Sequence, residues 1–586
     1  MWRPQLAQHS PLAVNMRRAF RARLRIITIA LVAVAALLVV RLYFVQVVHG
    51  GEFSLRAERQ YVSGSQQLYD RGSIYFTRKD GTLISAAALG TGFLIAINPS
   101  HLTDAEAAYA AISEQVAIDR EAFMASAAKE NDPYEVIIRR VPEEAGRIIS
   151  EKEIDGIIIE RERWRMYPAA THAARTIGFV AYDNDNSLAG RFGLERYYND
   201  VLEHKADGFG NFFAELFANL DSVVVDARSA REGDLVTTIE PVVQEKLDQI
   251  LAEVSATYNS PETGGIIMDP KTGEIVALGV YPSFDPNDFS GEDPSKFGNP
   301  LVENVYEFGS IMKPLTVAAG IDAGVINRDS TYNDTGRITL NTRTISNFDG
   351  KARGVVPMQE ILSQSLNTGV AHITQLLGHD RFRTYFKKLG FGTETGIDVP
   401  GELPGIVNNL DSPRDVEYVT VSFGQGIAIT PISMIRALGS LANEGQIVTP
   451  HLVRAIKLES GITKELNWGE PERVFSKQTT DTVSSMLTTV VDDALAGGTV
   501  KIDEMSVAAK TGTAQIAAPG GGYLEHSYHH SFFGYFPAHD PKYVILLYTR
   551  YPQGVQYASE TLTNPFMELT HFLINYYAVP PDRASL

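Results

Sequence analysis

Three short motifs in a fixed order constrain this chain more than any other feature. Ser310-Ile311-Met312-Lys313 comes first, Ser365-Leu366-Asn367 follows, and Lys510-Thr511-Gly512-Thr513 comes last, two hundred residues after the first. Each motif alone is common, but the ordered set Ser-x-x-Lys, Ser-x-Asn and Lys-Thr-Gly is typical of one kind of serine acyl-transfer site. Its chemistry requires a fold that brings three distant segments together around one pocket.

The chemistry of the motif residues predicts a catalytic group. A serine hydroxyl is a poor nucleophile until a neighbouring base takes its proton, and at a helical spacing of three residues Lys313 shares a face with Ser310. Because Lys313 must be neutral to act as this base, we expect burial and a second cation, Lys510, to lower its pKa from about 10.4. Ser365 is expected to pass protons between Lys313, Lys510 and the leaving amine.

The other motif residues are expected to bind the substrate: Asn367, Thr511, Gly512 and Thr513. Asn367 would hydrogen-bond either Lys313 or the substrate amide. The strand that carries Lys510 would lie along the substrate, with the hydroxyls of Thr511 and Thr513 at its terminal carboxylate. The backbone N–H groups of Ser310 and Thr513 are candidates for an oxyanion hole, and loss of one such donor typically costs ~100–1000-fold in rate.

Two further matches to these motifs are expected to be structural. Ser126-Ala127-Ala128-Lys129 ends an alanine-rich stretch, Ala105 to Lys129, which has a helical pattern and a side that should face solvent. On composition, a chain of this length should contain on the order of one or two chance Ser-x-x-Lys matches. Lys271-Thr272-Gly273 precedes Ser310, and its Asp-Pro-Lys-Thr-Gly-Glu context is typical of a hairpin turn.

An apolar segment near the N-terminus predicts a membrane anchor. Ile26 to Val40 contains no charge, and a second apolar run, Leu42 to Val48, follows Arg41. Together they can cross about 30 Å of hydrocarbon, and the arginine-rich, acid-free N-terminus before them should stay in the cytoplasm. We expect an uncleaved anchor with everything from about Gly50 outside the cell; a cleaved signal peptide is the alternative. Arg41 is expected either to reach the outer interface or to contact a partner membrane helix.

Composition excludes several classes of function. The formal net charge of −18 argues against nucleic acid as the main partner. The chain contains no cysteine, which excludes disulfides, thiolate catalysis and cysteine-ligated metals. The 13 histidines form no His-Glu-x-x-His motif, and we interpret His529-His530 as a surface pair and not as a metal site. No metal and no organic cofactor is expected.

Four segments are expected along the chain: a cytoplasmic tail (1–24), the membrane anchor (25–48), a second module (49–232) and a catalytic domain (233–586). In the second module, Val136 to Ile138 and Ile157 to Ile159 have the pattern of buried strands. This module shows no constellation of chemical groups. We therefore interpret it as a spacer and docking module.

The catalytic domain begins and ends with strand patterns. Glu240 to Val254 has helical spacing, and a strand–turn–strand pattern joins Gly265–Asp269 to Glu274–Leu278. Two more strands are predicted at Ser531–Phe536 and Tyr543–Thr549. A sheet built from both ends of the domain, with helices between, indicates an α/β or α+β class.

The chain resembles the class B penicillin-binding proteins, a family of monofunctional peptidoglycan D,D-transpeptidases, well beyond the three motifs. The matching blocks are Arg71-Gly72-Ser73-Ile74, Arg165-Met166-Tyr167-Pro168, Ile177-Gly178-Phe179-Val180, Gly193-Leu194-Glu195-Arg196-Tyr197-Tyr198, Glu307-Phe308-Gly309-Ser310 and Ser422-Phe423-Gly424-Gln425-Gly426. The last block resembles division-type members, which are similar to penicillin-binding protein 3. The chain departs from the family at Tyr75-Phe76, Phe308 and Ala509, where an acid, a proline and a glycine are usual. These departures remove no catalytic group.

The resemblance implies an α+β fold with a single membrane helix, an elongated extracytoplasmic pedestal or dimerisation domain, and a β-lactamase-like transpeptidase domain with an antiparallel sheet flanked by helices. It implies that Ser310 attacks the penultimate D-alanine of a stem peptide, releases the terminal D-alanine and passes the acyl group to an amine of a neighbouring stem. β-Lactams would acylate the same serine. A membrane glycosyltransferase of the SEDS type and other division proteins would be partners of the plasma-membrane-anchored protein.

Several alternatives remain open at the level of sequence. An elongation-type transpeptidase would share all the motifs. A D,D-carboxypeptidase or serine β-lactamase would replace the acceptor amine with water, although the long second module and the anchor argue against both. A non-catalytic β-lactam sensor or scaffold is opposed by a cytoplasmic part of only about 25 residues. The glycine-rich stretch Pro519 to Gly522 is either a flap over the cleft or a plain hairpin connection.

Overall fold

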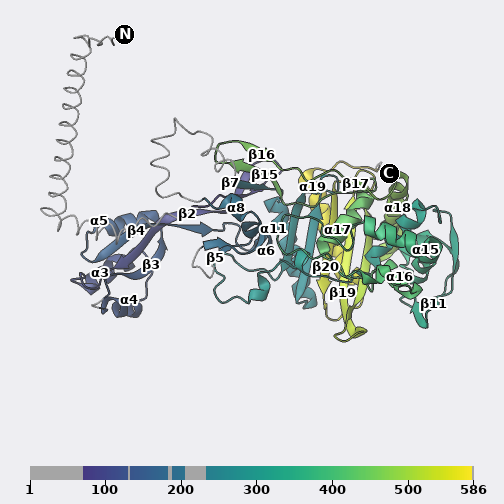
Figure 1. Cartoon of the computed structure of the whole chain (residues 1–586), viewed down its shortest axis with the longest axis horizontal. Coiled ribbons are helices and arrows are strands. Elements are labelled where there is room, and N and C mark those ends of the chain that lie inside the picture. The colour runs from purple at the N-terminus through teal and green to yellow at the C-terminus, as the bar shows by residue number, and fades with distance from the viewer. Residues whose placement is uncertain (1–69, 130–131, 183–187, 205–231, 584–586) are drawn as a thin grey trace, which may run out of the picture. The chain divides into compact units, whose positions relative to one another are not determined.

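The computed structural model describes residues 70–129, 132–182, 188–204 and 232–583 (Figure 1). The predicted cytoplasmic tail and membrane anchor, 1–24 and 25–48, lie outside these ranges. Within them, no helix is both long and apolar enough to span a membrane. The described residues form two compact units, one of residues 91–163 and one of residues 70–90 with 164–583. This division differs from the predicted limit at 232/233, and the predicted domain boundaries stay predictions.

The smaller unit is a sheet with three helices. Its elements are the end of β2 (Leu83–Ile97), β3 (Glu135–Val141), β4 (Ile157–Met166), α3 (Ala105–Ser113), α4 (Arg120–Ala127) and α5 (Glu143–Glu151). The predicted strands at 136–138 and 157–159 are confirmed, but the prediction that they are buried is wrong, because so small a unit leaves much of its sheet exposed. The single helix expected over 105–129 is two helices. Asp119 begins the second by accepting a hydrogen bond from the Ala122 N–H at 2.7 Å.

A five-stranded antiparallel sheet forms the centre of the larger unit, in the order β18-β19-β20-β8-β9. These strands are β8 (Glu262–Met268), β9 (Ile275–Tyr281), β18 (Ala508–Ala517), β19 (Tyr523–Phe536) and β20 (Tyr543–Arg550). The sheet is therefore built from both ends of the domain, as the sequence predicts. The α+β class and the antiparallel sheet with flanking helices are confirmed.

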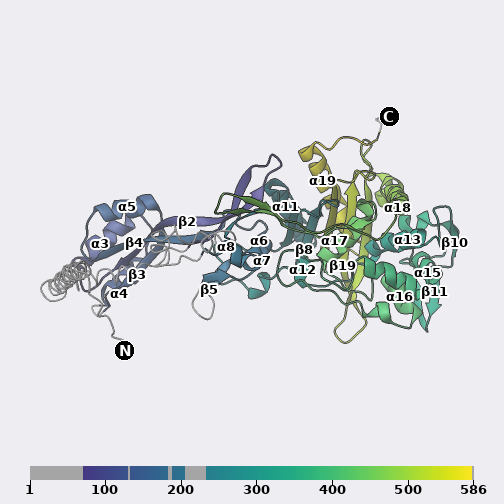
Figure 2. The same ribbon diagram turned by 45° about the horizontal axis from the view of Figure 1, so that its top comes forward.

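Both faces of this sheet are apolar, because apolar residues follow one another along its strands and point to alternate faces. Phe532 on β19 packs with helices α11 (Pro241–Tyr258) and α19 (Ala558–Tyr577), whereas its neighbour Phe533 belongs to the core shared with α13 (Lys313–Asp322) and α17 (Pro431–Gly439). Successive side chains of a strand point to opposite faces, so a continuous run of apolar residues fits a strand covered on both sides. Among the helices of the second face, α13 lies beside α15 (Asn367–Lys388), and α15 lies beside α16 (Asp415–Ser422) (Figure 2).

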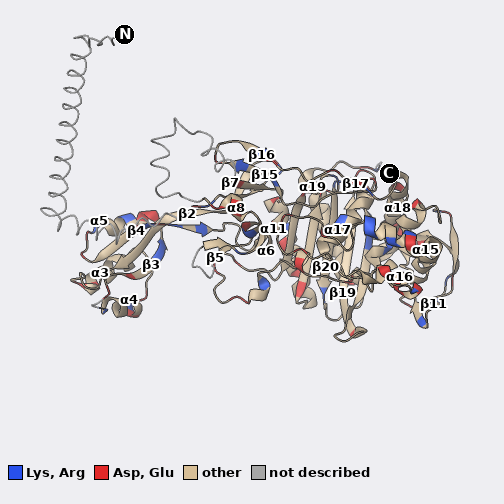
Figure 3. Cartoon of the chain, in the orientation of Figure 1, with Lys and Arg blue, Asp and Glu red and all other residues tan. Residues whose placement is uncertain are grey.

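The larger unit also contains shorter elements. They include α12 (Pro300–Glu303), α14 (Gln359–Ser363) and α18 (Lys477–Thr489), the paired strands β10 (Thr331–Asp334) and β13 (Gly354–Pro357), and the paired strands β11 (Arg337–Leu340) and β12 (Arg343–Ser346). Basic and acidic residues are interspersed around α15, α16 and α18 (Figure 3).

Strands join the N-terminal part of the larger unit to the rest, and buried charges hold that part together. The strands β1 (Ile74–Thr77) and β7 (Gly233–Thr237) pair in parallel, and β7 pairs with β15 (Val453–Leu458). Glu195 is fully buried and accepts hydrogen bonds at 2.6 Å from both Arg71 and Arg165. Burial alone would raise the pKa of Glu195, but the two arginines outweigh it and hold the pKa below its usual value. Three of the family-like blocks thus converge on one ion cluster.

Candidate active site

One cavity of about 600 Å³ collects most of the predicted site residues. Its wall includes Ser310, Ser365, Asn367, Lys510, Thr511 and Thr513. Lys313 and Gly512 are buried beside it and do not line it. The fold therefore brings together segments that lie up to two hundred residues apart in the chain.

Ser310 lies on a turn of 3-10 helix, η3 (Gly309–Met312), that leads directly into α13. Gly309 has a φ of +64°, which favours glycine, and a Cβ there would lie 2.7 Å from the carbonyl oxygen of Thr513. The glycine before the serine therefore lets η3 pack directly against β18.

Gly512 on β18 also allows the close packing of η3 against this strand. A Cβ at this position would lie 2.5 Å from the carbonyl oxygen of Phe308. The Ser531 hydroxyl, on β19, donates to this oxygen at 2.7 Å and lies 3.3 Å from the carbonyl oxygen of Gly512. The expected contact of Gly512 with substrate stays a prediction. Its observed role is to allow the close approach of β18 to the turn that carries Ser310.

Lys313 is positioned by the Ser-x-Asn motif. Its side chain is 0% exposed, and its Nζ donates to the carbonyl oxygen of Ser365 at 2.5 Å and to the Ser365 hydroxyl at 3.1 Å. Burial, and secondly the charge of Lys510, lower the pKa of Lys313 well below its usual value. A neutral amine in contact with a hydroxyl on the cavity wall can accept and return a proton.

The pKa of Lys510 is also lowered, but by burial alone. Lys510 is 3% exposed, and its Nζ donates to the carbonyl oxygen of Thr511 at 3.0 Å. Burial lowers the pKa of Lys510 to about 8. Burial thus lowers the pKa of both lysines, and the charge of Lys510 lowers that of Lys313 further, as expected for a pair of amines that exchange protons.

Ser365 and Asn367 lie where α14 ends and α15 begins. Ser365 has a φ of +54°, an uncommon conformation for a residue other than glycine. The Asn367 side chain donates through Nδ2 to the carbonyl oxygen of Ser346 at 2.9 Å. Within the described ranges it makes no hydrogen bond to Lys313, and its expected contact with a substrate amide stays a prediction.

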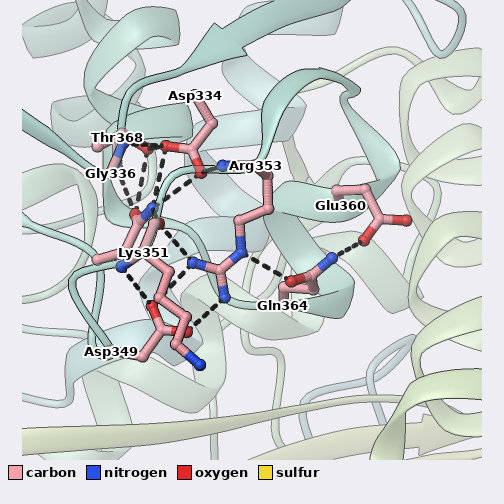
Figure 4. A network of polar contacts seen from close by, with 9 residues as sticks. Asp334, Gly336, Asp349, Lys351, Arg353, Glu360, Gln364 and Thr368 are labelled. Carbon is pink, nitrogen blue, oxygen red and sulfur yellow. Dashed lines mark hydrogen bonds and ion pairs between the residues drawn. The ribbon is translucent and has the colours of Figure 1, made fainter.

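The Asp334 carboxylate anchors the segment that follows Asn367. It accepts hydrogen bonds from the Thr368 hydroxyl at 2.7 Å, from Asn347 Nδ2 at 3.0 Å and from the Arg353 N–H at 3.0 Å (Figure 4). Thr368 directly follows Asn367, so one carboxylate ties the β10–β13 segment to the first turn of α15.

A second connection reaches the other side of Ser365. The Arg353 guanidinium binds both oxygens of Asp349 at 2.8 Å and donates through Nε to Gln364 Oε1 at 2.9 Å (Figure 4). The guanidinium also lowers the pKa of Asp349 to about 2. Gln364 directly precedes Ser365 and Thr368 lies three residues after it, so these bonds hold the chain on both sides of Ser365. None of these residues carries a recognisable sequence motif.

The mouth of the cavity contains two aromatic residues that the sequence analysis missed. Phe348 and Tyr557 line the cavity, and their ring centroids are 5.9 Å apart in an edge-to-face arrangement. The hydroxyl of Thr513 on β18 accepts a hydrogen bond from the Ala558 N–H at 3.0 Å. This bond connects β18 to the start of α19.

Neither chance motif lines this cavity. Lys129 forms an exposed ion pair with Glu135. Lys271 lies on the turn between β8 and β9, where its Nζ contacts Asp540 at 2.5 Å. These lysines are salt-bridged on the surface, and neither is positioned to activate a serine.

The interpretation of His529-His530 as a surface pair is wrong. Both residues are buried on β19, because β19 is an interior strand covered on both faces. His530 hydrogen-bonds the Thr561 hydroxyl and the carbonyl oxygen of Gln556, each at 3.0 Å. Over the described ranges, no group of three or more His, Cys, Asp or Glu residues could hold a metal ion.

The glycine-rich stretch forms a tight turn between β18 and β19. The Ala518 N–H donates to the carbonyl oxygen of Gly522 at 3.0 Å, and the Gly521 N–H donates to that of Ala518 at 3.1 Å. The stretch is thus a hairpin connection in this conformation, and its use as a flap stays a prediction.

The protein families that match this chain are consistent with a serine acyl-transfer site. The family described as "Penicillin binding protein transpeptidase domain" matches residues 263–569, and the "Penicillin-binding Protein dimerisation domain" matches residues 69–208. The chain therefore belongs to the penicillin-binding proteins that combine a dimerisation domain with a transpeptidase domain.

Curated relatives support this assignment at moderate identity. Stage V sporulation protein D of Bacillus subtilis is 29% identical over 442 residues, which are 73% of this chain and 66% of that protein. PbpB of Mycobacterium tuberculosis is 29% identical over 66% of this chain, and the match spans 58% of PbpB. The "Peptidoglycan D,D-transpeptidase FtsI homolog" of Mesostigma viride is 26% identical over 98% of this chain and 99% of its own length. The match thus spans about two thirds of the length of the sporulation protein and less of PbpB.

Solved structures agree on the fold. Penicillin-binding protein 3 from Mycobacterium tuberculosis is 27% identical, with a TM-score of 0.62 over 72% of this chain and 93% of that one. Penicillin-binding protein 2X from Streptococcus thermophilus is 20% identical with a TM-score of 0.70 over 87% of this chain and 80% of that one, a likeness in fold alone.

Proposed function

We propose that this protein is a peptidoglycan D,D-transpeptidase that works through a serine acyl-enzyme. The observation that carries the proposal is the buried Lys313 amine, bonded to Ser365 at the edge of the cavity that also holds Ser310 and Lys510. Family membership and the name of the Mesostigma relative support the same activity.

In the first half of the reaction, the Ser310 hydroxyl attacks the carbonyl carbon of the penultimate D-alanine of a donor stem. Lys313 takes the hydroxyl proton as the C–O bond forms. The C–N bond to the terminal D-alanine then breaks, and its nitrogen receives a proton through Ser365 from the lysine pair. The backbone N–H groups of Ser310 and Thr513 would stabilise the oxyanion.

In the second half, an amine of a neighbouring stem attacks the ester. The amine loses a proton to the lysine pair, the C–O bond to Ser310 breaks, and the serine recovers its proton. The products are a cross-linked peptide and free enzyme, so no metal or organic cofactor enters the balance. Asn367, Thr511, Gly512 and Thr513 would hold the donor along β18.

β-Lactams are expected to acylate Ser310 as analogues of the donor. Support comes from relatives of the same fold, since structures of the Mycobacterium tuberculosis penicillin-binding protein 3 are described as complexes with ampicillin and aztreonam. These proteins are 27% identical to the chain.

We assign the protein to septal wall synthesis at the plasma membrane. The apolar segment 26–48 supports a single-pass anchor with a cytoplasmic N-terminus, and the Ser422–Gly426 block supports a division role. A SEDS-type glycosyltransferase and other division proteins would bind the anchor and the module before residue 233. An elongation role is the alternative within this class.

A fluorescent penicillin distinguishes the proposed activity from its competitors. We expect stable labelling that is lost in Ser310→Ala and retained in Ser126→Ala, the matched control in the chance Ser-x-x-Lys motif. Rapid release of the label would indicate a β-lactamase, and the absence of labelling would indicate a scaffold. Incubation of the acyl-enzyme with an acceptor amine separates a transpeptidase from a carboxypeptidase, which would yield only the hydrolysed donor.

A further inference from the structure

The segment that follows α19, residues 579–583, holds two stretches of chain beside the active-site cavity. It runs from the end of α19 to the turn that follows α18 (Figure 1). This turn, η6 (Val490–Ala494), is one of the two stretches, and the other leads into β18, the strand that carries Lys510. Residues 579–583 carry no recognisable sequence motif, so only the fold shows this connection.

The turn η6 has a conformation that needs support from its surroundings. It is a turn of π-helix, in which the Leu495 N–H donates to the carbonyl oxygen of Val490, and such turns are rare and frequent at functional sites. Residues 496–498 follow with φ of +49°, +66° and +82°, and the first of them is an alanine. An alanine keeps such a φ only where the surrounding structure holds it. Because Val490 and residues 494–496 line the active-site cavity, the position of η6 determines the shape of that cavity.

Arg583 holds η6 through Asp492. Its Nη1 and Nη2 donate to the two carboxylate oxygens of Asp492 at 3.2 and 2.6 Å, and the two side chains are only 20% and 21% exposed. Nη1 also donates to the carbonyl oxygen of Ile502 at 3.2 Å. A guanidinium that binds both oxygens of a carboxylate fixes the orientation of that carboxylate as well as its distance.

Asp582 holds the stretch that leads into β18. Its carboxylate accepts hydrogen bonds from the Ser506 N–H, at 2.7 Å, and from the Ser506 hydroxyl. Ser506 is buried two residues before β18 begins, and Lys510 follows on that strand. Two consecutive residues, Asp582 and Arg583, are therefore bonded to the chain before β18 and to η6. The separation of these two parts of the site depends on one short segment.

Val579 docks the segment before these two polar residues. Its side chain is buried in an apolar cluster that also contains Val491 and Leu495, and its N–H donates to the carbonyl oxygen of Ile574 at 2.9 Å. Apolar burial is not directional, whereas a bidentate ion pair is. Ion pairs that solvent still reaches also contribute little to stability. We therefore expect Arg583 to affect the orientation of η6 more than the stability of the fold.

We propose that Asp582 and Arg583 are positioning residues of the acyl-transfer site, which hold η6 and the start of β18 at the separation that the donor requires. Neither residue lines the cavity, so both act through the residues they bind. The inference rests on the proposed function, since it assumes acylation in this cavity. Since η6 contributes cavity wall and β18 contributes Lys510, loss of Arg583 should weaken donor binding and loss of Asp582 should slow the acylation step.

Acylation by a fluorescent penicillin over a range of concentrations separates these two effects. It gives a dissociation constant for the first complex and a rate constant for acylation. Arg583→Met is expected to raise the dissociation constant about tenfold with little change in the rate constant. Asp582→Ala is expected to lower the rate constant about tenfold, less than the ~100-fold that a displacement of 1 Å can cost.

A rescue and a matched control make the test specific. Arg583→Lys keeps the charge without the fork and should recover part of the binding. Exchange of the two charges, Arg583→Asp with Asp492→Arg, should recover part of it as well. Arg454→Met is the control, because Arg454 binds Glu274 in the same two-bonded way, at 2.8 and 3.0 Å, and does not line the cavity. It should leave both constants unchanged.

The outcomes separate this inference from the proposed function. If penicillin acylates the wild type, and Arg583→Met and Asp582→Ala keep both of its constants, the positioning role is contradicted while the transpeptidase proposal stands. Lower melting temperatures with unchanged constants would also contradict it, because the segment would then be purely structural. If Arg583→Met does not fold, Arg583→Lys replaces it, and an unchanged dissociation constant there overturns the inference. If penicillin does not acylate the wild type, the proposed function itself fails.

Discussion

The Nζ of Lys313 lies 2.5 Å from the carbonyl oxygen of Ser365 and 3.1 Å from its hydroxyl. This pair joins two motifs that are 52 residues apart, and it places an amine with a strongly lowered pKa against a hydroxyl on the cavity wall. A protonated lysine would be costly in this buried position next to Lys510. The arrangement therefore favours the neutral base that Ser310 requires.

Replacement of Lys313 tests this role directly. Lys313→Ala is expected to lower the rate constant for acylation by penicillin by about 100–10,000-fold, the usual contribution of a general base. Lys271→Ala is the control, because that lysine belongs to the chance Lys-Thr-Gly and lies on an exposed turn. A rate constant within a factor of two of wild type in Lys313→Ala would exclude the proposed base.

The pH dependence of acylation follows from the two lysines. Acylation should rise with pH as Lys313 loses its proton, because the neutral amine is the active form. It should fall again as pH passes about 8, where Lys510 loses the charge that keeps the Lys313 pKa low and attracts a substrate carboxylate. The measurement is kcat/KM against pH for a donor peptide. A profile that rises steadily through this range would contradict the role of charged Lys510.

Gly512 should be intolerant of a side chain. In Gly512→Ala the new methyl group would meet the carbonyl oxygen of Phe308 at 2.5 Å and the Ser531 hydroxyl at 2.4 Å. Forcing β18 away from η3 should cost about 1–3 kcal/mol of stability, as overpacking usually does, and should slow acylation by moving Lys510 relative to Ser310. Thermal unfolding and the penicillin acylation rate test both effects. An unchanged melting temperature would show that the contact is looser than described.

The hydrogen bonds of Arg353 should matter for catalysis without touching the substrate. Arg353→Met removes the bonds to Gln364 and Asp349, so Ser365 should lose its fixed backbone and acylation should slow by about tenfold, equivalent to 1.4 kcal/mol. Arg353→Lys should rescue only part of the rate, since lysine cannot bind in the same bidentate way. Arg343→Met, on an exposed strand position, is the control. A lower melting temperature with a normal acylation rate would indicate a purely structural role.

Sequence reasoning predicts the site residues because the chemistry dictates their identity. A nucleophile, a base and a carboxylate-binding strand need particular residue types at short local spacings, and Ser310, Lys313 and Lys510 follow this pattern. The supporting residues have no such signature. Asp334 reaches Thr368 across 34 residues, and any buried acid could make the same bonds.

The errors in the sequence interpretation also have physical causes. His529 and His530 are polar, but they lie on the part of β19, from His529 to Phe536, that is buried on both faces of the sheet. The strands at 136–138 and 157–159 have apolar runs, yet their small unit cannot cover them. Burial depends on what a strand packs against, which local pattern does not report.

The most direct test of the account is mass spectrometry of the protein trapped with a donor peptide. The account predicts an adduct whose mass lacks the terminal D-alanine, mapped to the fragment containing Ser310, and transferred to an added acceptor amine with loss of the adduct. Ser310→Ala should show no adduct, whereas Ser126→Ala should show it in full. An adduct on a different residue, or turnover of the donor in Ser310→Ala, would contradict the central claim.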